Sequence, residues 1–136
     1  METIRTTYLG NLRTTAEHVQ SGQKLLTDAP VDNNGKGEYF SPTDLVGTAL
    51  ASCMLTIMGM IASRNNFSID GTRVKTTKVM TVSPRRIGEI IVELDFPTTT
   101  YSEKEKKLLE QSAKACPVAM SLHPDIKQTI IFNFRD

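Results

Sequence analysis

The chain has 136 residues, of which 39% are hydrophobic and 23% are charged, and 16 basic and 15 acidic residues leave a formal net charge of +1. These values are typical of an ordinary globular protein, and we predict a single domain over residues 1–136. The near balance of charge argues against nucleic acid or an acidic membrane surface as a partner, since both attract basic proteins.

The N-terminus and the two cysteines indicate the compartment. The opening residues METIRTTYLG contain no apolar stretch of the kind found in a secretory signal. Cys53 and Cys116 are therefore expected to be reduced thiols, and any disulfide between them would be transient and catalytic rather than structural. We expect a cytoplasmic protein.

The first third of the chain predicts strands followed by a loop. Residues 3–27 are rich in Thr, Tyr, Val and Ile and are interrupted by turn signals at Gly10-Asn11 and Ser21-Gly22, which is typical of hairpins. Residues 30–40 contain Asn34-Gly35 and Gly37 and predict a loop.

A helix is predicted to begin at Ser41. Ser41 suits the N-cap and Pro42 suits the first helical position, where a missing N–H costs nothing. Asp44 can reach back toward the N-cap, as in a capping box, and its charge complements the positive end of the helix. We expect the helix to end near Ser63, before Arg64-Asn65-Asn66.

The same helix carries no charged residue from Leu45 to Ala62, which is about the shortest apolar run that spans a membrane. Small and polar residues lower its hydrophobicity, among them Gly47, Thr48, Ser52, Thr56 and Gly59. A helix that is apolar on all sides can equally lie buried inside a protein. We therefore predict a buried helix and no membrane.

A long hairpin is predicted next. Residues 69–82 and 88–96 have strand patterns and are separated by a turn at Ser83-Pro84. In the second strand, alternate apolar residues share one face, namely Ile90, Val92, Leu94 and Phe96.

Two helices and a strand complete the chain. Ser102 with Glu105 predicts a second capping box, which opens an amphipathic helix through about Ala115. Cys116-Pro117 predicts another short helical segment, and residues 126–134 predict a last strand. The fold class is α+β.

The buried helix also bears on assembly. A helix without a polar face needs cover on every side, and one chain of this size has few elements to provide it. Two such helices packed back to back, each covered by a sheet, would satisfy this need. The order of elements therefore suggests an intertwined homodimer.

Each cysteine has a structural and a chemical interpretation. Cys53 lies midway along the apolar helix, where a free cysteine is usually a small core residue; a reactive thiol there requires a cationic partner. Cys116 precedes a proline and fits an N-cap, where the positive helix end favours the thiolate, but it could equally pack under the 103–115 helix. Zinc binding by Cys53, Cys116, His18 and His123 is disfavoured, because the four residues lack ligand spacing.

Two segments resemble the OsmC/Ohr family (osmotically inducible protein C / organic hydroperoxide resistance protein). The stretch SPTDLVGTALASCMLTIMGMIA, residues 41–62, is similar to the family's central helix, in which a proline near the start is followed by Ala-x-Cys in an apolar run. Ala115-Cys116-Pro117-Val118, followed by Ser121, resembles the second cysteine segment. The order of elements matches as well, so the similarity covers nearly the whole chain.

This resemblance implies a homodimer with antiparallel sheets wrapped around buried central helices and two active sites at the subunit interface. It implies a thiol-dependent peroxidase of the oxidative stress response that reduces organic hydroperoxides. Cys53 corresponds to the peroxidatic cysteine, which becomes a sulfenic acid, and Cys116 to the resolving cysteine, which forms a disulfide with it. An external dithiol of the lipoyl type would restore both thiols, and no bound cofactor or metal is implied.

The resemblance also implies an arginine that stabilises the thiolate and a glutamate that orients this arginine. Aligning the Gly10–Gly22 hairpin with the family brings Arg13 to the arginine position, although Arg13 could also be an exposed strand residue. The glutamate position is occupied by Thr43, and Asp44 is its neighbour. One residue corresponds to about 100° around a helix, so Asp44 cannot be assumed to substitute and could serve as a cap alone.

Two other functions stay open at this point. One is a weakly active or non-enzymatic dimer that binds a small hydrophobic molecule, which Thr43 favours. The other is a thiol redox sensor, in which oxidation changes a partner interaction without turning over peroxide. Arg13 placed against Cys53 would favour the enzyme.

Overall fold

The computed structural model describes residues 1–97 and 100–135. The chain forms two compact units, an N-terminal unit, Met1–Val46, and a C-terminal unit, Gly47–Asp136. Both units mix strands with helical segments, so the predicted α+β class is confirmed. The prediction of one domain over residues 1–136 stays a prediction.

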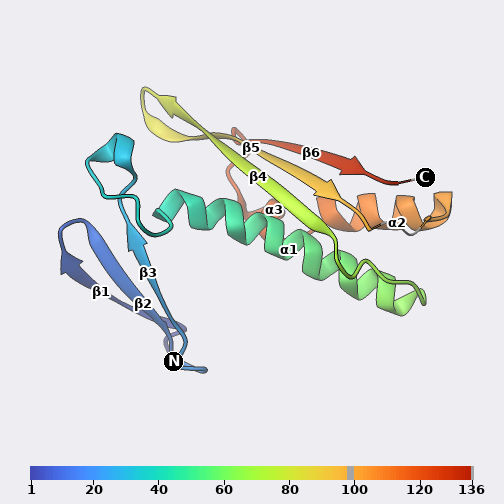
Figure 1. Cartoon of the computed structure of the whole chain (residues 1–136), viewed down its shortest axis with the longest axis horizontal. Helices are drawn as coiled ribbons and strands as arrows, with labels where there is room; N and C mark the ends of the chain where they lie inside the picture. The colour runs from blue at the N-terminus through green and yellow to red at the C-terminus, as the bar shows by residue number, and fades with distance from the viewer. Residues whose placement is uncertain (98–99, 136) are drawn as a thin grey trace. The chain divides into compact units, whose positions relative to one another are not determined.

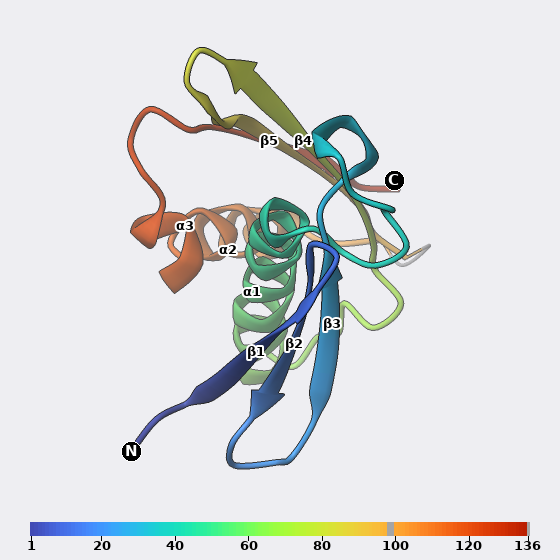
Figure 2. The same cartoon turned by 90° about the vertical axis from the view of Figure 1, so that its left-hand side faces the viewer.

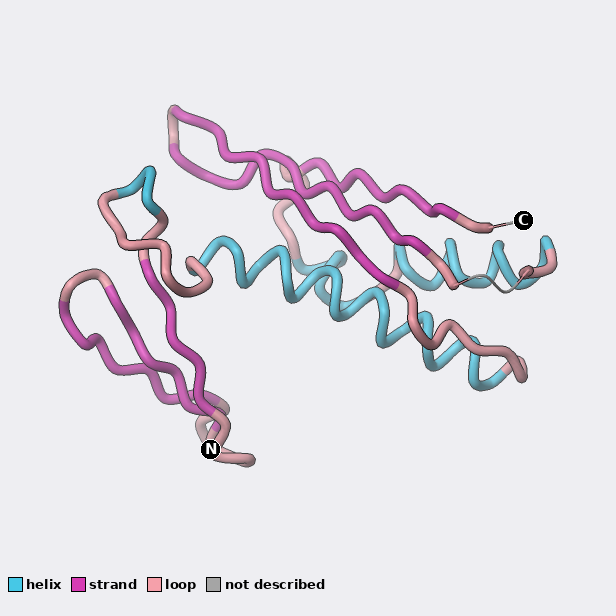
Figure 3. Tube along the Cα trace, in the orientation of Figure 1, coloured by secondary structure: helices cyan, strands magenta, loops and turns pink. Residues whose placement is uncertain are grey.

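The N-terminal unit is built on an antiparallel sheet of three strands, β1 (Ile4–Gly10), β2 (Arg13–His18) and β3 (Lys24–Asp28), paired in the order β1-β2-β3. In Figure 3 they are the three magenta strands nearest the N-terminus, and pink turns connect them. The turns lie where the sequence predicts them, since Asn11 and Gly22 both adopt positive φ angles. The following loop contains one 3-10 turn, Val31–Asn33.

The helix α1 (Pro42–Arg64) begins as expected. The backbone N–H of Asp44 donates to the Ser41 hydroxyl at 3.1 Å, and the backbone N–H of Ser41 donates to the Asp44 carboxylate at 2.9 Å. This reciprocal pair satisfies two donors at the helix start. The predicted helix start is confirmed, and its end is one residue beyond the predicted Ser63.

The core of the C-terminal unit lies between α1 and a second sheet. One row of α1 side chains at four-residue spacing is fully buried, consisting of Leu50, Met54, Met58 and Ala62. The predicted apolar face of the long hairpin is buried too, with Ile90, Val92, Leu94 and Phe96 at 0–1% exposure. Figure 2 shows the sheet on one side of this unit and its helices on the other.

The second sheet is mixed rather than wholly antiparallel. β4 (Arg73–Val82) and β5 (Arg85–Asp95) form an antiparallel hairpin, whereas β6 (Lys127–Asn133) runs parallel to β5. Figure 1 shows the chain leaving the end of β5, passing through the helices and returning alongside it. Such a crossover is the connection that parallel strands require, so the antiparallel expectation is wrong for β6.

The first strand of the long hairpin begins later than predicted. The sequence pattern indicated a strand from Ile69, but β4 starts at Arg73. Gly71 has a φ of +90°, and the Thr72 N–H donates to the Ile69 carbonyl at 3.0 Å. A left-handed residue and a closed turn are incompatible with an extended strand.

The two remaining helices connect β5 to β6. α2 (Glu103–Lys114) opens with the predicted capping box between Ser102 and Glu105. α3 (Pro117–Ser121) has Cys116 as its N-cap. Both assignments confirm the sequence prediction. Capping signals can be predicted because they depend on residues only three or four positions apart.

The remaining faces of α1 are not covered to the same extent. Ser52, Thr56 and Met60 are exposed in the single chain. By length and composition alone, α1 is also a candidate membrane span, with a mean hydropathy of 2.0. One row of its side chains is fully buried, while the buried share of its apolar window is 28%. The predictions of a helix buried on all sides and of back-to-back packing in a homodimer stay predictions.

Candidate active site

The two cysteines come together in the C-terminal unit. Cys53 lies on α1 next to the fully buried Met54 and is half-buried itself. Cys116 is 0% exposed, and its thiol lies close enough to that of Cys53 for the two to interact. The pairing arises because α3 follows α2 and brings the N-cap position beside the middle of α1.

The environment of Cys116 holds it as a thiol. Burial raises the pKa of Cys116, and the neighbouring Cys53 thiol raises it further, while the N–H groups of Ala119 and Val118 oppose this shift. The Ala119 N–H lies 3.4 Å from the sulfur. The sequence-based expectation that the N-cap favours a thiolate therefore differs from the structure: α3 has five residues, and desolvation outweighs its few N–H groups.

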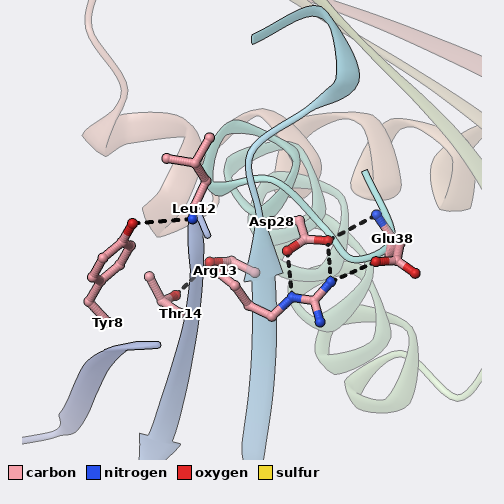
Figure 4. A network of polar contacts seen from close by, with 7 residues as sticks. Tyr8, Leu12, Arg13, Thr14, Asp28 and Glu38 are labelled. Carbon is pink, nitrogen blue, oxygen red and sulfur yellow. Dashed lines mark hydrogen bonds and ion pairs between the residues drawn. The ribbon is translucent and has the colours of Figure 1, made fainter. Parts of the chain in front are cut away.

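Arg13 lies at the centre of an ion-pair network in the N-terminal unit, shown in Figure 4. Its Nε and Nη2 donate to the two carboxylate oxygens of Asp28 at 2.7 and 2.9 Å. Nη2 also donates to Glu38 at 2.8 Å, and the Tyr39 ring lies 4.7 Å from the guanidinium carbon. These contacts raise the pKa of Arg13 and lower that of Asp28.

The two residues proposed to support Arg13 have other partners in this unit. The Asp44 carboxylate accepts the Ser41 N–H, and the Thr43 hydroxyl lies 3.2 Å from the Ser41 hydroxyl. The carboxylates bound to Arg13 are instead those of Asp28 and Glu38, which sequence reasoning did not single out.

The register of the β2–β3 hairpin, which the sequence alone did not determine, places Asp28 directly across from Arg13. The turn of the β2–β3 hairpin is closed by hydrogen bonds between His18 and Gln23 and between Gly22 and His18. Counting outward from this turn pairs Arg13 with Asp28, and the observed register is the same. Oppositely charged residues placed directly across two strands attract each other. No comparable signal existed for Glu38, since it comes from the loop.

Within residues 1–97 and 100–135, no group of three or more His, Cys, Asp or Glu side chains could hold a metal ion. Cys53 and Cys116 are both free cysteines.

Comparison with known proteins identifies the family to which the fold belongs. Residues 35–130 match the family model of the OsmC-like proteins. A solved structure from Psychrobacter arcticus 273-4, provisionally assigned to osmotic stress induction and the detoxification response, has 50% sequence identity and a TM-score of 0.93 and covers 98% of this chain and 96% of its own. No curated protein is significantly similar in sequence.

More distant structures share the fold. The organic hydroperoxide resistance protein OsmC of Legionella pneumophila has 15% identity and a TM-score of 0.76, with 98% of both chains covered. An organic hydroperoxide resistance protein of Elizabethkingia anophelis has 13% identity and a TM-score of 0.67, with 98% of this chain and 97% of its own covered. This chain belongs to the OsmC-like family, and the predicted resemblance is confirmed.

Proposed function

We propose that this protein is a thiol-dependent peroxidase that reduces organic hydroperoxides through a Cys53 sulfenate and a Cys53–Cys116 disulfide. The observation that supports it most is the proximity of the half-buried Cys53 thiol to the fully buried Cys116 thiol. Peroxide can reach the first, while the second is shielded from oxidation and available to the first. Membership of the OsmC-like family adds to this support.

The proposed reaction has three balanced steps. The Cys53 thiolate attacks one peroxide oxygen, the O–O bond breaks, and an alkoxide leaves and is protonated to the alcohol, so that Cys53 becomes a sulfenic acid. Cys116 then attacks the Cys53 sulfur, an S–S bond forms, and the sulfenic oxygen leaves as water with the Cys116 proton. An external dithiol reduces this disulfide by thiol–disulfide exchange and is itself oxidised to a disulfide.

The raised pKa of Cys116 fits the second step. A buried thiol that keeps its proton does not compete with Cys53 for peroxide, because thiolates are the reactive species. When the sulfenic acid forms beside it, the departing oxygen accepts the Cys116 proton. The buried environment of Cys116 therefore leaves the attack on peroxide to Cys53 and the attack on the sulfenic acid to Cys116.

Arg13 is proposed to stabilise the Cys53 thiolate and to bind the peroxide. A guanidinium is always charged and presents several N–H groups in one plane, which suits an anionic sulfur and an oxygen together. We further propose a cytoplasmic homodimer whose partners are the hydroperoxide and a dithiol, with no bound cofactor and no nucleic-acid or membrane partner. Apolar side chains exposed in the single N-terminal unit favour the homodimer, including Ile4, Tyr8, Leu9, Leu12 and Leu25.

The test is peroxide consumption with a lipoyl-type dithiol, for the wild type and the variants Cys53→Ser and Cys116→Ser. Cys53→Ser should abolish turnover, and Cys116→Ser should permit one round of peroxide reduction without recycling through the internal disulfide. A wild type that consumes no more peroxide than Cys53→Ser would reject the peroxidase. Retained binding of a small hydrophobic molecule would then favour the non-enzymatic alternative.

A further inference from the structure

We propose that Asp28 and Glu38 have opposite effects on Arg13: Asp28 holds the guanidinium in position, and Glu38 competes with the anionic groups that Arg13 is to bind. This inference rests on the proposed function, because it concerns how Arg13 is made available to a thiolate or a peroxide. The two carboxylates differ in burial, in number of contacts and in the atoms of Arg13 that they occupy.

Asp28 is built as a permanent partner. Its side chain is 2% exposed, and its carboxylate accepts three hydrogen bonds, two from Arg13 and one from the backbone N–H of Glu38 at 3.1 Å. Paired N–H groups that meet both oxygens of a carboxylate fix the guanidinium plane as well as its position. The pKa of Asp28 is held below its usual value, mainly by Arg13, so the carboxylate stays ionised.

Glu38 is built as an exchangeable partner. Its side chain is 60% exposed and makes one ion pair, to the same Nη2 atom that already serves Asp28. Exposed ion pairs of this kind contribute little free energy. The backbone of Glu38 is anchored separately by its N–H bond to Asp28, so its side chain can rotate away while the loop stays in place.

Release of the Glu38 side chain from Arg13 would change both the local charge and the number of free N–H donors. Arg13, Asp28 and Glu38 together carry a net charge of −1, which the nearby Lys36 partly offsets, and the second carboxylate weakens the attraction of the guanidinium for an incoming anion. Among the residues that the structure describes, Nη1 of Arg13 donates to no partner, and Tyr39 covers one face of the guanidinium. Release of Glu38 would remove one negative charge and free an Nη2 N–H beside those of Nη1. An anionic sulfur or peroxide oxygen would then meet a fork of donors.

The experiment compares Glu38→Gln, Asp28→Asn and the matched control Glu103→Gln, which removes the carboxylate of an 88% exposed side chain from its ion pair with Lys106 in the other unit. The first readout is the Cys53 pKa, measured by thiolate absorbance on the Cys116→Ser background. Glu38→Gln should lower this pKa, Asp28→Asn should raise it, and Glu103→Gln should leave it unchanged.

The direction in which Asp28→Asn changes the Cys53 pKa distinguishes a positioning role of Asp28 from a purely electrostatic one. If Asp28 acted through its charge alone, its removal would lower a thiol pKa, as the removal of Glu38 does. An increase therefore reports loss of guanidinium positioning. The second readout is steady-state kinetics, where Glu38→Gln should lower the KM for an organic hydroperoxide several-fold and Asp28→Asn should reduce kcat/KM.

The possible failures are distinguishable. If Arg13→Ala leaves both readouts unchanged, the proposed role of Arg13 fails. If Arg13→Ala raises the Cys53 pKa but Glu38→Gln leaves it unchanged or raises it, the competition is overturned while the function stands. Should Asp28→Asn not fold, Glu38→Gln and Glu38→Ala decide the competition by themselves. The thiolate titration requires no turnover, so it decides the matter even in an inactive protein.

Discussion

The fully buried thiol of Cys116 lies beside the half-buried thiol of Cys53, although the two belong to different helices far apart in the sequence. Cys116 is the N-cap of α3, and its sulfur accepts the Ala119 N–H at 3.4 Å. In the proposed mechanism, the second thiol attacks the oxidised Cys53 from a position that is closed to solvent.

Replacing the buried Cys116 thiol should change how the half-buried Cys53 is oxidised. In Cys116→Ser, a sulfenic acid at Cys53 has no neighbouring thiol, so excess hydroperoxide should oxidise it to the irreversible sulfinic acid. Mass spectrometry of the intact protein should show added oxygen at Cys53 in this variant and not in the wild type. If the wild type and Cys116→Ser gain oxygen equally, Cys116 does not resolve Cys53.

The Arg13–Asp28 pair predicts a pH dependence of stability. Because the pKa of Asp28 is lower in the folded protein than its usual 3.8, its contribution is present above that value and is lost as pH falls through the lowered one. Asp28→Asn should therefore lower the urea midpoint at neutral pH, and the difference from wild type should shrink in acid below about pH 4. Equal midpoints at neutral pH would contradict a stabilising role for the pair.

The buried row of α1 predicts a large cost for a core truncation. Met58 is fully buried, so Met58→Ala should destabilise the protein by about 2–5 kcal/mol through lost burial and a cavity. The matched control is Met120→Ala, the same substitution at a side chain that is 74% exposed, which should cost less than about 0.5 kcal/mol. Denaturant unfolding measures the free energy of unfolding of both variants. A similar loss of stability in the two would contradict the assignment of Met58 to the core.

The exposed apolar surface predicts self-association. Met60 on α1 and several side chains of the N-terminal sheet are apolar and exposed in the single chain. Burying such surface between two copies is favourable, so light scattering at micromolar concentration should give twice the 15.1 kDa chain mass. A mass of one chain would reject the proposed homodimer.

Features encoded by neighbouring residues could be predicted from the sequence. The capping pairs Ser41–Asp44 and Ser102–Glu105 and the apolar face of β5 are all present, because each depends on residues two to four positions apart. The start of β4 was predicted too early, because the turn around Gly71 interrupts a pattern that still looks extended.

Long-range features required more than local patterns. The parallel pairing of β6 and the contact between Cys53 and Cys116 depend on how the α2–α3 crossover returns the chain, and resemblance to the family indicated the second of these. The raised pKa of Cys116 could not be predicted, because burial cannot be read from an N-cap signal. Glu38 reaches Arg13 from a loop, whose course no periodicity determines.

The most direct test of the central claim is peptide mapping of the reduced wild-type protein after one equivalent of an organic hydroperoxide, such as tert-butyl hydroperoxide. Our account predicts a single new link between the peptides that contain Cys53 and Cys116, which a dithiol then removes. A disulfide requires the two Cα atoms to lie within roughly 4.4–6.8 Å of each other, and we expect the short segment that carries Cys116 to make any movement that this requires. Recovery of Cys53 as a free thiol, with the peroxide unconsumed, would contradict the account.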